Sequence, residues 1–166
     1  MKHRFFFLVF ALISFISVSA QQKLTTFILL RHAEKVSDGS KNPNLTESGK
    51  KRAESLVSFF KNTAIQAIYS TPFIRARETV EPLAKAKSIS ISEYEAFKSE
   101  AIDKIFKDFE GGTILIRGHS NNIPWIANYL TGSEKFKTFD DDDYGNVLVV
   151  SVAEIGKITS VTWLHY

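Results

Sequence analysis

The feature that most constrains the fold of this chain is an alternation that begins after residue 21. Short continuous apolar runs alternate with longer stretches whose apolar residues recur at helical spacing. A continuous apolar run indicates a strand covered on both faces, as in a parallel sheet with helices on either side. Such runs separated by helical segments are typical of βαβ units. We therefore predict an α/β domain, a three-layer α/β/α sandwich with a mostly parallel sheet.

The same pattern gives approximate bounds for each element. We expect strands over residues 25–30, 67–70, 88–92, 113–116, 148–153 and 158–164, and helices over residues 45–61, 72–85, 101–109 and 123–130. Thr71-Pro72 predicts a helix start, because threonine caps helices and proline is favoured at the first helical position. The last two strands flank Gly156-Lys157 and predict a hairpin at one sheet edge. No repeat or composition shift marks a second domain.

Residues 1–20 have the pattern of a secretory signal peptide. Residues 1–4 carry two positive charges, residues 5–18 are an apolar run interrupted by two serines, and Ala20 ends a run of small residues. A membrane-spanning helix needs about 20 apolar residues, so we expect no stable membrane anchor, with an uncleaved anchor as the alternative. We predict cleavage after Ala20 and a secreted or periplasmic domain over residues 21–166.

Charge and cysteine content exclude several function classes. The chain has 21 Lys and Arg against 18 Asp and Glu. Two of these cations lie in residues 1–20, which leaves 19 against 18, a net charge of +1, in the expected mature domain. This balance gives no support for nucleic-acid binding. The chain has no cysteine, which excludes disulfides, thiolate zinc sites and cysteine nucleophiles.

Polar residues follow three of the expected strands, at the strand ends where open α/β sheets bind ligands. The segments read RHAEK over residues 31–35, STPFIRARET over residues 70–79 and IRGHSN over residues 116–121. Each presents an arginine or a histidine where side chains of different strands converge. We expect one polar site at this edge of the sheet.

These segments resemble the motifs of the histidine phosphatase superfamily, also called phosphoglycerate mutase-like. The likeness is carried by Arg-His-Ala-Glu after the first strand, Arg-Ala-x-x-Thr at a helix start after the second, and a late strand ending in Gly-His. It spans residues 26–150. The resemblance implies that His32 is the phosphorylated nucleophile and that Arg31, Arg75 and His119 surround the phosphoryl group.

The chemistry of these residue types agrees with the resemblance. A phosphate monoester carries about −1.5 to −2 charges near neutral pH, and guanidinium groups bind its oxygens in pairs. Arg31 and Arg75 would form that clamp. An imidazole can attack phosphorus when a hydrogen bond holds the proton on one ring nitrogen and leaves the other free, which is the role expected of His32. His119 would donate a hydrogen bond to an equatorial oxygen and, if protonated, stabilise charge on it.

Several neighbouring residues could have either a binding role or an ordinary surface role. Lys35, Ser120 and Asn121 are candidates for substrate binding because they follow the same strands, but Lys35 could equally form a surface ion pair with Glu34. For the arginine of the second segment, a solvent-facing role beside Glu78 or Thr79 is the alternative. We assign such a role to Arg77, since the family pattern places its arginine two residues earlier.

Hydrolysis also needs a proton for the leaving oxygen, and a carboxyl group with a raised pKa is the usual donor. The resemblance places this acid within residues 92–97. Glu95 is the first candidate and Glu93 the second, although both could be ordinary loop carboxylates. The four consecutive acids at residues 140–143 predict a solvated loop, since like charges repel one another.

The function predicted from the sequence is hydrolysis of a small phosphate ester through a phosphohistidine on His32, by a monomer without cofactor. We expect no metal, because the histidines of residues 21–166 lack the spacing of a metal site. A hydrolase is favoured over a mutase because only about 20 residues, between 92 and 113, could form a lid.

Three alternatives stay open at this point. A non-catalytic phosphate- or phosphosugar-binding protein would keep the arginines, and a protein phosphohistidine phosphatase would use the same residues. A serine hydrolase built from Ser120, the 140–143 acids and His165 has the right order, but the final glycine of its nucleophile elbow is missing.

Overall fold

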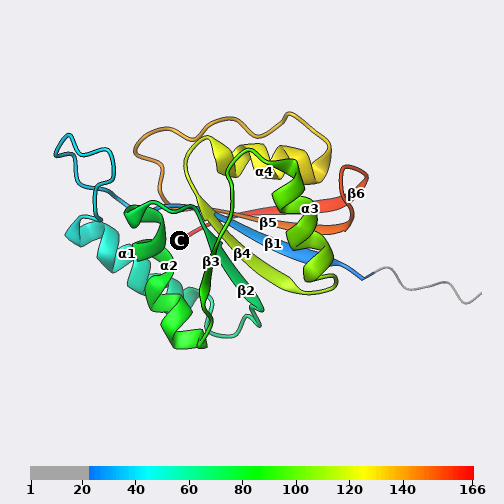
Figure 1. The fold of residues 1–166 in the computed structure, drawn as a ribbon, viewed down its shortest axis with the longest axis horizontal. Coiled ribbons are helices and arrows are strands. Elements are labelled where there is room, and N and C mark those ends of the chain that lie inside the picture. Colours follow the sequence, from blue (N-terminus) through cyan, green and yellow to red (C-terminus); the bar gives the residue numbers. More distant parts are fainter. Residues whose placement is uncertain (1–22) are drawn as a thin grey trace, which may run out of the picture.

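The computed structural model describes residues 23–166, so the signal-peptide prediction for residues 1–20 lies outside the described residues. Within them, six strands form one sheet with four helices around it (Figure 1). The strands are β1 (Thr25–Arg31), β2 (Ala67–Ser70), β3 (Ile91–Glu93), β4 (Thr113–Gly118), β5 (Asn146–Glu154) and β6 (Ile158–His165). The helices are α1 (Glu47–Phe59), α2 (Ile74–Lys87), α3 (Ser99–Asp108) and α4 (Asn122–Thr131).

The sheet is mixed, with the strand order β3-β2-β4-β1-β5-β6. The pairs β3–β2, β2–β4 and β4–β1 are parallel, whereas β5 runs antiparallel to β1 and β6 antiparallel to β5. The predicted α/β sandwich and the hairpin at one edge are therefore confirmed. No helix among residues 23–166 is long and apolar enough to cross a membrane.

Both faces of the sheet are buried, which explains the continuous apolar runs. On β1, Phe27 and Leu29 belong to the core that α3 and α4 cover, and Ile28 and Leu30 belong to the core that α1 and α2 cover. Successive strand residues point to opposite faces, so a strand between two helical layers must be apolar at every position.

Helix starts account for the main difference from the predicted bounds. Helix α1 begins at Glu47, and the Oγ1 atom of its N-cap Thr46 accepts a hydrogen bond from the Gly49 N–H at 3.0 Å. The prediction that Thr71 caps the next helix is wrong. Helix α2 begins at Ile74 and its N-cap makes no side-chain hydrogen bond, because the Thr71 hydroxyl lies against a histidine instead.

Main-chain hydrogen bonds join the three polar segments at one edge of the sheet. The His32 N–H donates to the Gly118 carbonyl at 2.9 Å, which ties the segment after β1 to the end of β4. The Thr71 N–H donates to the Arg117 carbonyl at 3.3 Å, which ties the segment after β2 to the same strand. The parallel pairing thus brings together residues far apart in the sequence.

Candidate active site

His32 is buried and its ring is fixed by one hydrogen bond. Its side chain is 3% exposed, and its Nδ1 atom lies 2.8 Å from the Ala33 carbonyl oxygen. A carbonyl can only accept, so Nδ1 carries the ring proton and Nε2 keeps a free lone pair. Burial lowers the pKa of His32 to about 2; the Ala33 contact opposes this shift, and the charges of Arg117, His119 and Arg31 reinforce it. The imidazole is therefore neutral at physiological pH.

The loop that carries His32 is held by the helix that carries Arg75. The Ala33 N–H donates to Thr79 Oγ1 at 3.0 Å, and this hydroxyl donates to the Arg75 carbonyl at 2.7 Å. Ala33 and Thr79 are both fully buried. The threonine of the Arg-Ala-x-x-Thr segment therefore fixes the backbone next to His32.

His119 stands edge-on to His32, with ring centroids 5.4 Å apart. Its Nδ1 lies 3.4 Å from Arg75 Nη2, and its Nε2 lies 2.9 Å from Thr71 Oγ1. A guanidinium only donates, so Nδ1 is the acceptor and Nε2 carries the proton. Burial, together with the charges of neighbouring arginines, lowers the pKa of His119 to about 4. His119 is thus neutral, and its one N–H points at the Thr71 hydroxyl next to the His32 ring.

Arg75 presents donors that have no acceptor among the described residues. Its Nε and Nη1 atoms are buried and unpaired, and its guanidinium carbon lies 4.5 Å from the centre of the Phe73 ring. The alternative pairing with Glu78 is wrong, since Glu78 accepts a hydrogen bond from the Leu45 N–H at 2.7 Å. Buried donors of this kind, beside two histidines, suit an anion.

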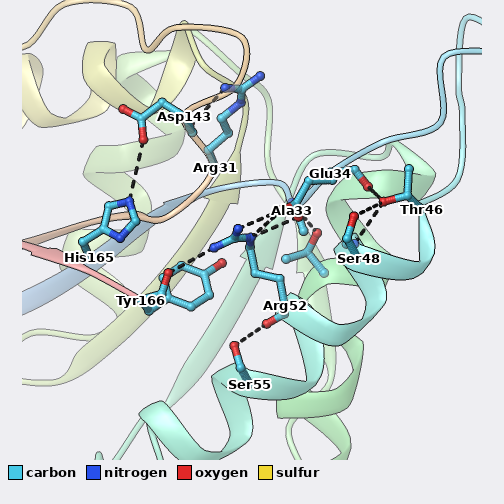
Figure 2. A network of polar contacts seen from close by, with 12 residues as sticks. Arg31, Ala33, Glu34, Thr46, Ser48, Arg52, Ser55, Asp143, His165 and Tyr166 are labelled. Atoms are coloured by element: carbon cyan, nitrogen blue, oxygen red, sulfur yellow. Dashed lines mark hydrogen bonds and ion pairs between the residues drawn. The ribbon is translucent and has the colours of Figure 1, made fainter.

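Arg31 is 2% exposed and is held by the loop of residues 140–143. Its Nη1 donates to the main-chain carbonyls of Asp140 and Asp143, and its Nη2 donates to the carbonyl of Asp141 at 3.1 Å. Figure 2 shows its side chain next to Asp143. The Tyr144 ring lies against the guanidinium, and its centre is 4.3 Å from the Arg31 guanidinium carbon. The loop is thus more than the solvated acidic loop that its composition predicted, because its carbonyls bind a buried arginine.

Glu95 and Glu93 line a groove of about 450 Å³ together with Thr71 and Phe73. Both Thr71 and Phe73 contact His119, which places the groove next to that histidine. Glu93 forms an ion pair with Arg77 at 3.2 Å, in line with the minor role expected for that arginine. Glu95 is exposed and has no ion pair among residues 23–166.

Lys35, Ser120 and Asn121 make no side-chain hydrogen bond to either site histidine within the described residues. Lys35 and Asn121 are exposed, and Ser120 contributes its carbonyl to a hydrogen bond from the Phe139 N–H. The alternative for Lys35, an ion pair with Glu34, does not occur among the described residues.

Glu34 instead pairs with Arg52, whose Nε and Nη2 atoms donate to its carboxylate at 2.8 to 3.0 Å (Figure 2). The same arginine donates to the Tyr166 carbonyl at 3.0 Å. The serine-hydrolase alternative gains no support, because His165 lies 3.9 Å from Asp143 and makes no contact with Ser120 among the described residues (Figure 2). No cluster of three or more His, Cys, Asp or Glu side chains suited to a metal ion occurs in residues 23–166.

Two buried residues of the site were missed by the sequence interpretation. Asn122 accepts a hydrogen bond from the His119 N–H and donates one to the Tyr94 hydroxyl at 2.7 Å. Arg117 is fully buried on β4, directly before Gly118-His119. A signal for Arg117 was present, since a charged residue inside an apolar strand is uncommon.

Comparisons with known proteins agree with this fold. The sequence model of the histidine phosphatase superfamily (branch 1) matches residues 27–100. The structure of the protein histidine phosphatase SixA complexed with tungstate is similar, with a TM-score of 0.70 at 16% identity over 84% of this chain and 96% of that one. A phosphoserine phosphatase variant from Entamoeba histolytica in complex with phosphoserine has a TM-score of 0.65 at 16% identity, over 83% of this chain and 95% of that one.

Phosphoglycerate mutase from Bacillus anthracis gives a TM-score of 0.66 at 17% identity, over 86% of this chain and 93% of that one. The likeness to these structures confirms the expected phosphoglycerate mutase-like fold. No curated protein matches the sequence.

Proposed function

We propose that this chain, which belongs to the histidine phosphatase superfamily, is a phosphomonoesterase that works through a phosphohistidine on His32 and needs no metal ion. The observation that carries the proposal is the state of the His32 ring. Its Nδ1 proton is held by the Ala33 carbonyl at 2.8 Å, so Nε2 has a free lone pair. A neutral, oriented imidazole next to unpaired guanidinium donors is suited to attack on phosphorus.

The first step forms a bond between His32 Nε2 and phosphorus and breaks the bond from phosphorus to the ester oxygen. The electron pair of that bond goes to the leaving oxygen, which takes a proton from the Glu95 carboxyl group. Arg75 donates hydrogen bonds to the non-bridging oxygens as negative charge moves onto them, and the His119 Nε2–H exchanges the Thr71 hydroxyl for one of these oxygens. Such preorganised donors contribute the largest single effect in many enzymes.

The second step returns the site to its starting state. Water attacks the phosphorus of the phosphohistidine and gives its proton to the Glu95 carboxylate. The nitrogen–phosphorus bond breaks, the electron pair returns to Nε2, and inorganic phosphate leaves. Glu95 thus acts first as acid and then as base, a role that suits an exposed carboxyl group at the edge of a groove.

The segment between residues 92 and 113, the one expected to be able to form a lid, favours hydrolysis over a mutase reaction. Helix α3 occupies most of the chain between β3 and β4, and its Ile102 and Ile105 are buried in the core. A helix anchored in this way is not free to close over the site. The groove at Glu95 is lined by Thr71 and Phe73, which contact His119, and we propose it as the route by which water reaches a phosphorylated His32.

The nature of the phosphate ester is the next question. A protein phosphohistidine phosphatase would use the same residues, and SixA, one of the similar structures, is described as a protein histidine phosphatase. The non-catalytic alternative is disfavoured because binding alone would not require a free Nε2 on a buried imidazole. We also propose that the domain acts outside the cytoplasm as a monomer, which an intact mass starting at Gln21 and a sedimentation measurement would test.

The test of the proposed function is turnover by metal-free protein. Protein treated with EDTA should hydrolyse p-nitrophenyl phosphate at the rate of untreated protein, and a panel of phosphate esters and phosphohistidine should then rank its substrates. Loss of activity on chelation, restored by a divalent ion, would contradict the metal-free mechanism. Tight phosphate binding without turnover of any ester would favour the non-catalytic alternative.

A further inference from the structure

Glu95 lies in a short segment, residues 94–98, that joins β3 to α3. Tyr94 is buried and attaches the start of this segment, because its hydroxyl accepts a hydrogen bond from Asn122 at the start of α4, at 2.7 Å. Glu95 itself is exposed and has no ion pair among the described residues. The backbone of the 94–98 segment therefore decides where the Glu95 carboxyl group lies.

Phe97 has a backbone conformation that is unusual for its residue type. Its φ angle is 59°, in the left-handed region, which among the described non-glycine residues is shared only by Ser88. An aromatic residue is unfavourable there, because its Cβ atom crowds the neighbouring carbonyl oxygen, and glycine or asparagine is the usual choice. The ring is also 49% exposed, so burial alone does not account for it. A strained residue of this kind persists where surrounding contacts hold it.

The contact that holds Phe97 is with α4. Its ring and the Trp125 ring meet edge to face, with centroids 5.7 Å apart and an angle of 66° between the planes. Such pairs are favoured by the charge distribution of aromatic rings. Trp125 stacks in turn on Tyr129, at 5.8 Å and 5°, and both pack against the core. The Tyr129 hydroxyl donates to Asp103 on α3 at 2.5 Å. This aromatic row thus attaches the 94–98 segment to the layer of α3 and α4.

Two attachments to α4 therefore flank Glu95. Asn122 binds Tyr94, one residue before it, and Trp125, about one helical turn further along, contacts Phe97, two residues after it. A segment that is fixed on both sides of a carboxyl group limits the positions that this group can take. A proton donor must be held within hydrogen-bond reach of the leaving oxygen, so this limit matters for the reaction.

We propose that Phe97 is a positioning residue for the general acid, whose ring, held on Trp125, keeps the Glu95 carboxyl group in the groove next to His119. The inference rests on the proposed function for the role of Glu95 as the proton donor. The attachment of the 94–98 segment stands on the contact of Phe97 with Trp125 alone. Without the ring, the segment is free to leave the groove, and a substrate whose leaving oxygen needs a proton reacts more slowly.

The test uses two variants that release the segment and two that do not. Phe97→Gly removes the ring and suits the left-handed backbone, and Trp125→Leu removes the partner of the ring. Phe97→Tyr keeps the ring and is the conservative replacement that should restore the behaviour of the parent. Ser88→Gly is the matched control, because it replaces the other left-handed residue, which is exposed and caps the end of α2 opposite to Arg75.

The first measurement is proteolysis and needs no activity. A glutamyl endopeptidase can cut after Glu95 only when the segment opens away from the fold. At equal protease concentration, we expect this cut to be at least about tenfold faster in Phe97→Gly and Trp125→Leu than in the parent. Phe97→Tyr and Ser88→Gly should be cut at the parent rate. Parent-like cleavage in both releasing variants would overturn the proposal. Cleavage throughout the chain in both would also overturn it, because a local attachment does not hold the whole fold.

The second measurement separates positioning of the acid from a purely structural role. The ratio of kcat/KM for an alkyl phosphate to that for p-nitrophenyl phosphate should fall at least about tenfold in Phe97→Gly and Trp125→Leu, because only the alkyl leaving group depends on the proton of Glu95. Phe97→Tyr and Ser88→Gly should keep the parent ratio.

Glu95→Gln in the same assay distinguishes the two ways in which the ratio could stay unchanged. If Glu95→Gln lowers the ratio and the releasing variants do not, the positioning role of Phe97 is overturned. If Glu95→Gln also leaves the ratio unchanged, the acid assignment of the proposed function is refuted. A parent that turns over no ester would refute only the proposed function, since the cleavage rates still test the attachment of the segment.

Discussion

The buried side-chain oxygen of Asn122 accepts a hydrogen bond from the main-chain N–H of His119 at 2.6 Å. The amide nitrogen of the same side chain donates to the Tyr94 hydroxyl at 2.7 Å. A single residue at the start of α4 thus joins the end of β4 to the segment that carries Glu95. Gly118 is part of this arrangement, because a Cβ atom there would lie 2.4 Å from Asn122 Oδ1.

Replacing Asn122 by Leu should therefore weaken both folding and catalysis. The change leaves the His119 N–H and the Tyr94 hydroxyl without their partner, and an unsatisfied buried polar group costs about 1 to 3 kcal/mol. Urea denaturation should show a loss of this size, with a lower kcat towards p-nitrophenyl phosphate. Asn121→Leu, at the exposed neighbouring position, should keep the parent kcat. Equal effects at the two positions would show that the hydrogen bonds of Asn122 do not matter.

Arg75 should act on the reaction rather than on folding. Arg75→Met removes two buried donors that have no acceptor within the described residues, Nε and Nη1, and one long hydrogen bond from Nη2 to His119, so the melting temperature should change little. Loss of one preorganised donor to a developing negative charge costs ~2.7 to 4 kcal/mol of transition-state stabilisation, or roughly 10²- to 10³-fold in kcat. Steady-state kinetics would measure this, with Arg77→Met as a control of near-normal rate. A small kinetic effect with a large stability loss would reverse the assignment.

The role of Glu95 can be tested through the leaving group. Glu95→Gln should slow alkyl phosphates severely, because an alkoxide leaves poorly without a proton. p-Nitrophenyl phosphate should be affected much less, since its phenolate leaves largely unaided. The variant should also lose the alkaline limb of the alkyl-phosphate pH profile. Glu93→Gln, which only breaks an exposed pair with Arg77, is the control; equal losses on both substrates would assign Glu95 to binding or folding.

The two site histidines, one buried and one half-buried, should make the protein less stable as the pH falls. Burial lowers the pKa of His32 to about 2 and that of His119 to about 4, whereas a histidine in an unfolded chain titrates near 6.5. Between pH 6.5 and about 4 the unfolded chain binds protons that the folded protein does not bind. The free energy of unfolding therefore falls with falling pH, by at most about 1.4 kcal/mol per pH unit for each histidine.

Urea denaturation at pH 7, 6 and 5 would measure this slope. His32→Gln should reduce the dependence of the unfolding free energy on pH by the contribution of one histidine. His165→Gln, at an exposed position, should keep the slope of the parent. A parent slope that His32→Gln leaves unchanged would show that folding does not lower the pKa of His32.

Much of this architecture could be predicted from the sequence, because strands buried on both faces must be continuously apolar. The polar segments after β1, β2 and β4 could be placed at one edge, since the carboxyl ends of parallel strands meet there. His32, His119 and Arg75 follow from that rule. The start of α2 could not be predicted in this way. The Thr71 hydroxyl can either cap a helix or bind a distant side chain, and in the structure it binds His119.

The features that were missed depend on main-chain geometry or on burial. Arg31 is held by carbonyls of residues 140–143, and a carbonyl is common to every residue type, so no side-chain pattern reports it. Arg117 was interpreted as the polar end of a strand, whereas β4 continues to Gly118 and buries it. Asparagine is common at helix starts, so Asn122 gave no signal in the sequence. Its role depends on a hydrogen bond to Tyr94, which is distant in the sequence.

The most direct test of the account is to trap the phosphorylated protein. The parent, mixed with p-nitrophenyl phosphate and quenched rapidly in alkali, should gain one phosphoryl group by intact mass, and alkaline-stable, acid-labile phosphate should map to His32 by peptide analysis. His32→Ala should show neither the added mass nor turnover, because no other residue supplies the attacking nitrogen. A phosphoryl group on any other residue, or normal turnover by His32→Ala, would contradict the phosphohistidine mechanism.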